Sequence, residues 1–162
     1  MTGIEVSLVS GEDLASPLKL LEEVLRDGEP LPGEFVERLR GAVASGELEV
    51  LAASAGGRTV GVAVVAYRPS VSAAADFASI EELHVRPGER RQGIGRALLE
   101  AVEARISGRG VSYVEVQTDD EAAEFYAAHG YEEDAAHGYE EESGARVLSK
   151  SLPIINELKP ET

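Results

Sequence analysis

Residues 79–99, SIEELHVRPGERRQGIGRALL, decide the fold of this chain. Apolar residues at Ile80, Leu83 and Val85 predict a strand. The proline that follows ends this strand, because proline has no N–H group for the sheet. Apolar residues then recur at spacings of three and four over residues 94–106, which predicts a helix. The stretch therefore predicts a strand, a tight basic turn and a helix in succession.

The turn between this strand and this helix has the composition of an anion site. Gly93 and Gly95 have no Cβ atom, so a ligand can approach the backbone closely. The start of a helix presents unpaired N–H groups and a partial positive charge. Arg90, Arg91 and Arg96 add positive charge around it. These residues predict a seat for a diphosphate, and the alternative is an ordinary turn whose basic residues are solvated.

Two segments of the chain resemble motifs of the GNAT superfamily of N-acetyltransferases. Residues 83–99, with Arg-x-x-Gly-x-Gly at their centre, are similar to the acetyl-coenzyme A site of that family. Residues 122–131, AAEFYAAHGY, are similar to its Phe-Tyr-x-x-x-Gly-Phe/Tyr segment. The resemblance implies an α/β (α+β) fold, in which about four helices flank a mixed, mostly antiparallel central sheet of about seven strands.

The remaining elements are expected from hydrophobic periodicity and turn residues. We expect Ser10 to cap the first helix, with Leu25 on its buried face, and Phe35 to face the core from the second helix. Gly56 and Gly57 indicate a hairpin, and residues 69–76 are expected to form a loop. The expected strands are 4–9, 48–55, 59–67, 77–85, 111–117 and 145–152, and the expected helices are 10–26, 34–44, 94–106 and 118–129.

Length and charge restrict the class of protein. With 162 residues we expect one domain over residues 1–152 and a tail over residues 153–162. The net charge of −15 argues against a nucleic acid or an anionic membrane surface as partner, and it suits either a cationic substrate or solubility alone. The chain has no cysteine, no apolar run of membrane-spanning length and no secretory signal, so we expect a cytoplasmic protein.

A short duplication occurs near the C-terminal end. Residues 127–134, AAHGYEED, are repeated as residues 135–142, AAHGYEEE. Two such short copies cannot form a repeat fold, so we interpret residues 127–142 as a tandem duplication that lengthens the hairpin before the last strand. Only the first copy follows Phe-Tyr, so the resemblance gives the second copy no role. The histidines of the two copies alone are too few ligands for a metal, and no metal is expected.

The resemblance implies that acetyl-CoA is the donor substrate and that the strand, the turn and the helix start hold it. Backbone groups of Leu83 and Val85 would bind the pantetheine arm and the thioester. His84 matches a variable position of the family, so a structural role is its default interpretation. The implied cofactor-binding residues are Leu83, His84, Val85, Arg90, Arg91, Gln92, Gly93, Ile94, Gly95 and Arg96.

Acetyl transfer to an amine also needs a base and an acid. An alkyl ammonium group has a pKa of about 10.4, so a proton must be removed before attack. The resemblance implies Glu81 or Glu82 as the base and Tyr126 as the acid that protonates the leaving sulfur. Adjacent strand residues point to opposite faces, so one of the two carboxylates would face the acceptor. The alternative is that both carboxylates only bind a cationic substrate.

The sequence specifies the acceptor substrate less closely than the donor substrate. The resemblance implies direct attack, in a ternary complex, by a primary amine of a small cationic molecule such as an aminoglycoside or a polyamine. An aminoglycoside acceptor would imply antibiotic resistance. Two alternatives stay open, an acetyltransferase of protein N-termini or lysines and a non-catalytic acyl-CoA-binding module. Dimers are common in the family, so a homodimer is compatible with the resemblance.

Overall fold

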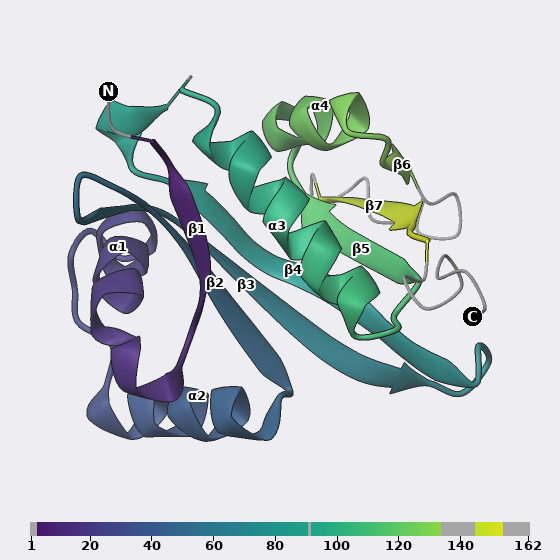
Figure 1. Ribbon diagram of the computed structural model, residues 1–162, viewed down its shortest axis with the longest axis horizontal. Coiled ribbons are helices and arrows are strands. Elements are labelled where there is room, and N and C mark those ends of the chain that lie inside the picture. The colour runs from purple at the N-terminus through teal and green to yellow at the C-terminus, as the bar shows by residue number, and fades with distance from the viewer. Residues whose placement is uncertain (1–2, 91, 134–144, 154–162) are drawn as a thin grey trace, which may run out of the picture. The chain divides into compact units, whose positions relative to one another are not determined.

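The computed structural model describes residues 3–90, 92–133 and 145–153. Seven strands and four α-helices are present in this part of the chain, together with two 3-10 turns (Figure 1). In chain order they are β1 (Glu5–Val9), η1 (Gly11–Asp13), α1 (Ala15–Leu25), α2 (Gly33–Ser45), β2 (Leu48–Ala55), β3 (Arg58–Ser70), β4 (Ala75–Val85), η2 (Pro87–Glu89), α3 (Ile94–Gly108), β5 (Tyr113–Thr118), α4 (Asp120–Ala128), β6 (Glu132–Glu133) and β7 (Arg146–Ser151).

The strands are hydrogen-bonded in the order β1-β2-β3-β4-β5-β7-β6. The pairs β1–β2, β2–β3, β5–β7 and β6–β7 are antiparallel, whereas β4 and β5 are parallel. The expected mixed, mostly antiparallel sheet with four helices is therefore confirmed. No helix in the described part of the chain is both long enough and apolar enough to cross a membrane.

The chain divides into two compact units. The first unit comprises described residues within 1–67 and 82–104, and the second comprises those within 68–81 and 105–162. The expectation of one domain over residues 1–152 stays a prediction. The second copy of the duplication and residues 154–162 of the tail lie outside the described residues.

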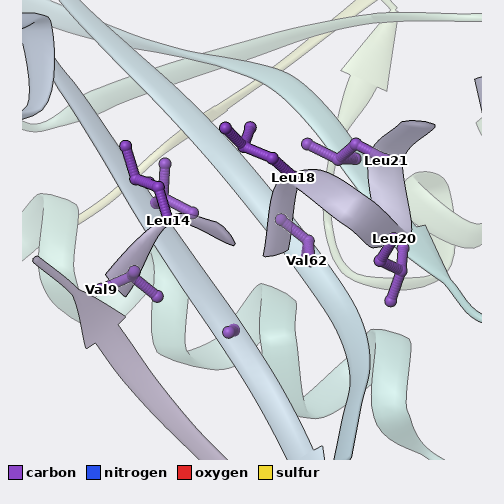
Figure 2. Close-up of a cluster of buried hydrophobic side chains, with 8 residues drawn as sticks. Val9, Leu14, Leu18, Leu20, Leu21 and Val62 are labelled. Carbon is purple, nitrogen blue, oxygen red and sulfur yellow. The ribbon is translucent and has the colours of Figure 1, made fainter. Parts of the chain in front are cut away.

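In the first unit, α1 and α2 cover one face of β1, β2 and β3. Figure 2 shows the leucines of the α1 segment beside valines of β1 and β3. Burying each such side chain stabilises the fold by about 1.5–3 kcal/mol. Val36, Leu39 and Val43 of α2 pack against the same cluster. The buried members of the cluster are Val9, Leu14, Leu18, Leu20, Leu21, Val50, Ala52 and Val62.

The first helical segment differs from the expectation. Ser10 does not cap a continuous helix: the 3-10 turn η1 comes first, and the Ser10 hydroxyl donates to the Asp13 carboxylate at 3.0 Å. Leu25, expected on the buried face, is 49% exposed at the end of α1, while Leu20 is fully buried. The expectation was wrong here because the turn shifts which leucines of α1 meet the sheet.

Phe35 was also assigned wrongly to the core. It lies in the first turn of α2, is 40% exposed, and stacks under the Arg38 guanidinium at 5.9 Å from the ring centroid. The cation provides a partner for the ring at the surface. Helical spacing alone does not distinguish such a pair from a core contact.

Two hairpins join β2, β3 and β4. The first turn has φ of +59° at Gly56 and +77° at Gly57, as a two-residue hairpin requires, which confirms the expected turn. The loop expected over residues 69–76 is shorter than predicted: β3 continues to Ser70 and β4 begins at Ala75, so only residues 71–74 form the turn. Proline at position 69 is tolerated because the register with β2 ends at Ala66.

At the tip of the second hairpin, Val71 is 98% exposed. An apolar side chain in such a position adds nothing to the core, so the turn does not depend on this residue for packing.

In the second unit, β5 and β7 form the main antiparallel pair and α4 contacts β7. The parallel register of β4 with β5 covers residues 78–80 of β4, among the residues that the structure describes. The side chain of Asp119 caps α4 by accepting from the N–H of Ala122 at 2.8 Å. At the other end of this helix, Lys150 Nζ donates to the carbonyl oxygen of His129 at 2.8 Å, where a cation is favourable.

Candidate functional site

The end of β4 carries three of the predicted cofactor-binding residues. Leu83, His84 and Val85 are half-buried. The main-chain N–H of Arg86, which follows them, donates to the carbonyl oxygen of Val60 on β3 at 2.8 Å. Two apolar side chains therefore stay partly open to a ligand, on a strand end that a neighbouring strand holds in place.

The start of α3 has the properties of an anion seat. Gly93 has φ of +80°, and its carbonyl oxygen accepts a helical hydrogen bond from the N–H of Ala97 at 3.0 Å. A glycine at this position has no side chain to bond the helix amides, and the first turn contains no acidic residue. The amides of Ile94, Gly95 and Arg96 have no acceptor within the helix. An external phosphate can satisfy them.

The basic residues around this helix start differ in their partners. Arg96 Nε donates to Glu100 Oε1 at 3.1 Å, one turn along the exposed face of α3. Arg90 is exposed and makes no hydrogen bond or ion pair with the described residues, so its charge is available to a ligand. Gln92 is also exposed, and Arg91 lies outside the described residues.

A neighbouring arginine has a role that sequence reasoning missed. Arg86 Nη1 donates to Glu23 Oε2 of α1 at 2.7 Å, and its Nε donates to the carbonyl oxygen of Thr59 at 3.3 Å. The guanidinium thus joins α1 to the ends of β3 and β4. The sequence carries no local signal for this pair, because the two partners are 63 positions apart.

The two candidate bases have different surroundings. Glu82 Oε1 lies 2.7 Å from Nε2 of His84, and both side chains are partly buried. Glu81 is exposed, and its Oε2 accepts from the hydroxyl of Ser79 at 2.8 Å. Each carboxylate contacts a residue two positions away on the strand, as expected for side chains on opposite faces. The structure therefore brings Glu82 and His84 together and leaves Glu81 apart from them.

Tyr126 lies in α4 within an aromatic cluster. It is 5% exposed, and its ring meets those of Phe125 and Tyr131 edge-on, with centroids 5.1 and 5.4 Å away. Nδ1 of His129 lies 2.8 Å from the carbonyl oxygen of Phe125 and therefore donates to it. The rings hold Tyr126 in one orientation, because edge-to-face pairs restrict their movement.

The predicted site residues are divided between the two units. Glu81 and Tyr126 belong to the second unit, and the predicted residues from Glu82 to Arg96 belong to the first. A shallow surface hollow also lies along α2 and the start of β2. None of the predicted site residues lines it, so it is separate from the candidate chemistry.

The chain matches a family model described as an acetyltransferase (GNAT) domain over residues 22–146. An aminoglycoside N(6')-acetyltransferase type 1 of Klebsiella aerogenes is 34% identical over 106 residues, which cover 63% of this chain and 70% of that protein.

Two solved structures from uncultured soil metagenomic samples share this fold. One is an aminoglycoside acetyltransferase, 25% identical, with a TM-score of 0.70 and coverage of 83% of this chain and 95% of the other. The second is an aminoglycoside acetyltransferase in complex with sisomicin, 23% identical, with a TM-score of 0.69 and coverage of 78% and 87%.

Proposed function

Because the chain belongs to the GNAT family of acetyltransferases, we propose that it transfers an acetyl group from acetyl-CoA to an amine of an aminoglycoside. The start of α3 carries this proposal. It combines a glycine cap, amides without an intrahelical acceptor and a first turn without acidic residues, in a chain of net charge −15. The likeness to the Klebsiella aerogenes enzyme supports an aminoglycoside as the acceptor.

The residues at this helix start fit the diphosphate of coenzyme A. The amides from Gln92 to Arg96 would bind the phosphate oxygens, and the available charge of Arg90 would strengthen that binding. Backbone groups of Leu83 and Val85 would bind the pantetheine arm along the partly open end of β4. When bound, acetyl-CoA supplies the acetyl thioester for the reaction.

We infer that Glu82, rather than Glu81, is the base. With Oε1 bonded to His84 Nε2, the carboxylate of Glu82 is held in one orientation and its Oε2 stays free to take a proton from the acceptor ammonium, directly or through one water. His84 would thus be a positioning residue for this base. Exposed Glu81 would instead attract the cationic acceptor.

Tyr126 is proposed as the acid. Its phenol O–H group can give a proton to a leaving thiolate. The buried ring and its edge-on neighbours support a fixed hydroxyl position. A fixed proton donor needs less reorganisation during the reaction than a mobile one.

Thiol release from acetyl-CoA tests the function, with sisomicin, spermidine and a lysine-containing peptide as separate acceptors. We expect thiol release with sisomicin and a singly acetylated product by mass spectrometry. Release with spermidine or the peptide alone would contradict an aminoglycoside acceptor. Calorimetric binding of coenzyme A without thiol release from any acceptor would favour a non-catalytic binding module.

A homodimer is compatible with the proposed function, and only the resemblance to the family supports it. Light scattering at assay concentration measures the oligomeric state, and a monomeric mass at full activity would contradict a homodimer.

A further inference from the structure

Gly61 of β3 lies against both α3 and β4. A Cβ atom built at this glycine would be 2.8 Å from Leu98 Cδ1, 3.0 Å from Ile94 Cγ2 and 3.3 Å from the carbonyl oxygen of His84. Atoms in real proteins do not approach a Cβ as closely as 2.8 Å. The space at Gly61 therefore holds a hydrogen atom and no methyl group.

Close approach, and not backbone conformation, requires glycine here. Gly61 is not among the glycines with positive φ, so its backbone conformation is available to any residue. It is buried in the middle of a strand, where glycine packs less surface than other residues and is unfavourable. A neighbour that must come close explains such a glycine.

The contacts of Gly61 involve both parts of the proposed donor site. Ile94 is the first residue of α3, whose amides would bind the diphosphate. His84 lies on β4, between the two residues whose backbone would bind the pantetheine arm. The missing side chain of Gly61 thus allows the helix start to approach the strand end.

We propose that Gly61 is a positioning residue that sets the spacing between the diphosphate seat and the thioester strand, an inference that rests on the proposed function. Leu98 and Ile94 are fully buried, so neither side chain can turn into solvent to make room for a methyl group. The third neighbour is a backbone atom. A methyl group at this position therefore displaces α3 from β4, and coenzyme A, which binds at both, no longer fits both at once.

Titration calorimetry of Gly61→Ala with coenzyme A and with inorganic pyrophosphate tests this inference. We expect the Kd of coenzyme A to rise by about tenfold or more, because a displaced contact is lost, while the Kd of pyrophosphate stays within about twofold of wild type. Equal weakening of both ligands, or no weakening of coenzyme A, would overturn the spacing role.

Val62→Ala is the matched control. Val62 is the next residue of the strand, and its side chain faces the opposite cluster under α1. Losing its methyl groups leaves a cavity on the α1 side of the sheet and lowers stability without touching α3. We expect a coenzyme A Kd equal to wild type, and a Kd as weak as that of Gly61→Ala would overturn the inference.

The double variant Gly61→Ala/Leu98→Ala tests the spacing role of Gly61 even where Gly61→Ala alone does not fold. Removing Leu98 Cδ1 relieves the shortest of the three contacts, the one at 2.8 Å, so the Kd of coenzyme A should return to within about threefold of Leu98→Ala alone. A double variant still weaker than that would overturn the inference. Absence of coenzyme A binding by the wild type would instead contradict the proposed function itself.

Discussion

α3 and α4 begin in opposite ways. α4 starts at Asp119, whose carboxylate bonds a helix amide, and Asp120 and Glu121 follow in the first turn. α3 starts after Gly93, which has no side chain, and its first turn has no acidic residue. The start of α4 is therefore complete within the protein, whereas that of α3 is suited to an anion from outside.

The surrounding charges strengthen this contrast. Arg146 lies at the acidic start of α4, with Nη1 3.4 Å from the carboxylate of Asp120. At α3, by contrast, Arg90 has no acidic partner among the described residues. The charges at the start of α4 are thus neutralised within the protein, whereas the start of α3 carries an unneutralised positive charge. The first arrangement suits a structural role and the second suits binding of an anion.

Tyr126→Phe should have the largest effect and tests whether α4 contributes chemistry. Removing the hydroxyl while keeping the ring should lower kcat by about a hundredfold or more, because a general acid is lost. The coenzyme A Kd, measured by calorimetry, should not change. Tyr131→Phe removes a hydroxyl from the adjacent ring and serves as control, and equal kcat in wild type and Tyr126→Phe would remove this residue from the mechanism.

Gly93→Asp should give α3 a start that resembles the start of α4, and so remove the difference between the two helices. The new carboxylate would bond the free amides and repel the diphosphate, so the coenzyme A Kd should rise by about thirtyfold. Gly93→Asn carries similar backbone strain at positive φ without the charge. If the aspartate and asparagine variants bound coenzyme A equally weakly, strain and not charge would be the cause.

Asp119→Ala should act in the opposite sense, on stability alone. Loss of the cap should lower the free energy of unfolding by about 1 kcal/mol, measured by urea denaturation, with the coenzyme A Kd unchanged. Asp119→Ser retains a capping oxygen and should recover most of the loss. An alanine variant as stable as wild type would show that the cap adds nothing to α4.

The smallest effect concerns pH and the pair beside α4. Hydrogen bonds from Arg146 at 3.0 and 3.1 Å lower the pKa of Glu133 from its ordinary value of 4.5. Because the folded-state pKa is the lower one, the pair stabilises the fold above the ordinary pKa, and this contribution is lost as pH falls through the folded-state pKa.

Glu133 is exposed and Arg146 is half-buried at the surface, so solvent screens the pair and the effect on stability should be small. The Tm of the wild type should therefore be slightly higher than that of Glu133→Gln at pH 7, and this difference should disappear in acid. A difference that is constant with pH would contradict this assignment.

Local patterns could be predicted from the sequence, and contacts between distant segments could not. The paired glycines at positions 56 and 57 and the strand–turn–helix around Gly93 were predicted because turn chemistry acts over a few residues. A loop was expected over residues 69–76 because they are mostly small, yet strand pairing extends into both ends of this stretch and leaves only residues 71–74 as the turn.

Contacts between distant segments also limit what the sequence predicts about the candidate site. The sequence places Glu81 and Glu82 on opposite faces, but only the contact of Glu82 with His84 separates their roles. A glycine within a strand indicates a close neighbour, but the sequence does not say that the neighbour of Gly61 is α3, because this depends on how the helix packs. The pair of Arg86 and Glu23 likewise depends on where α1 lies, which no local pattern encodes.

The exposed tip of the β3–β4 hairpin has a practical consequence. Val71 is 98% exposed, and the chain contains no cysteine. A Val71→Cys variant would therefore carry a single thiol at a position that packs against nothing. One fluorophore or spin label could be attached there without removing any native sulfur and without loss of core contacts.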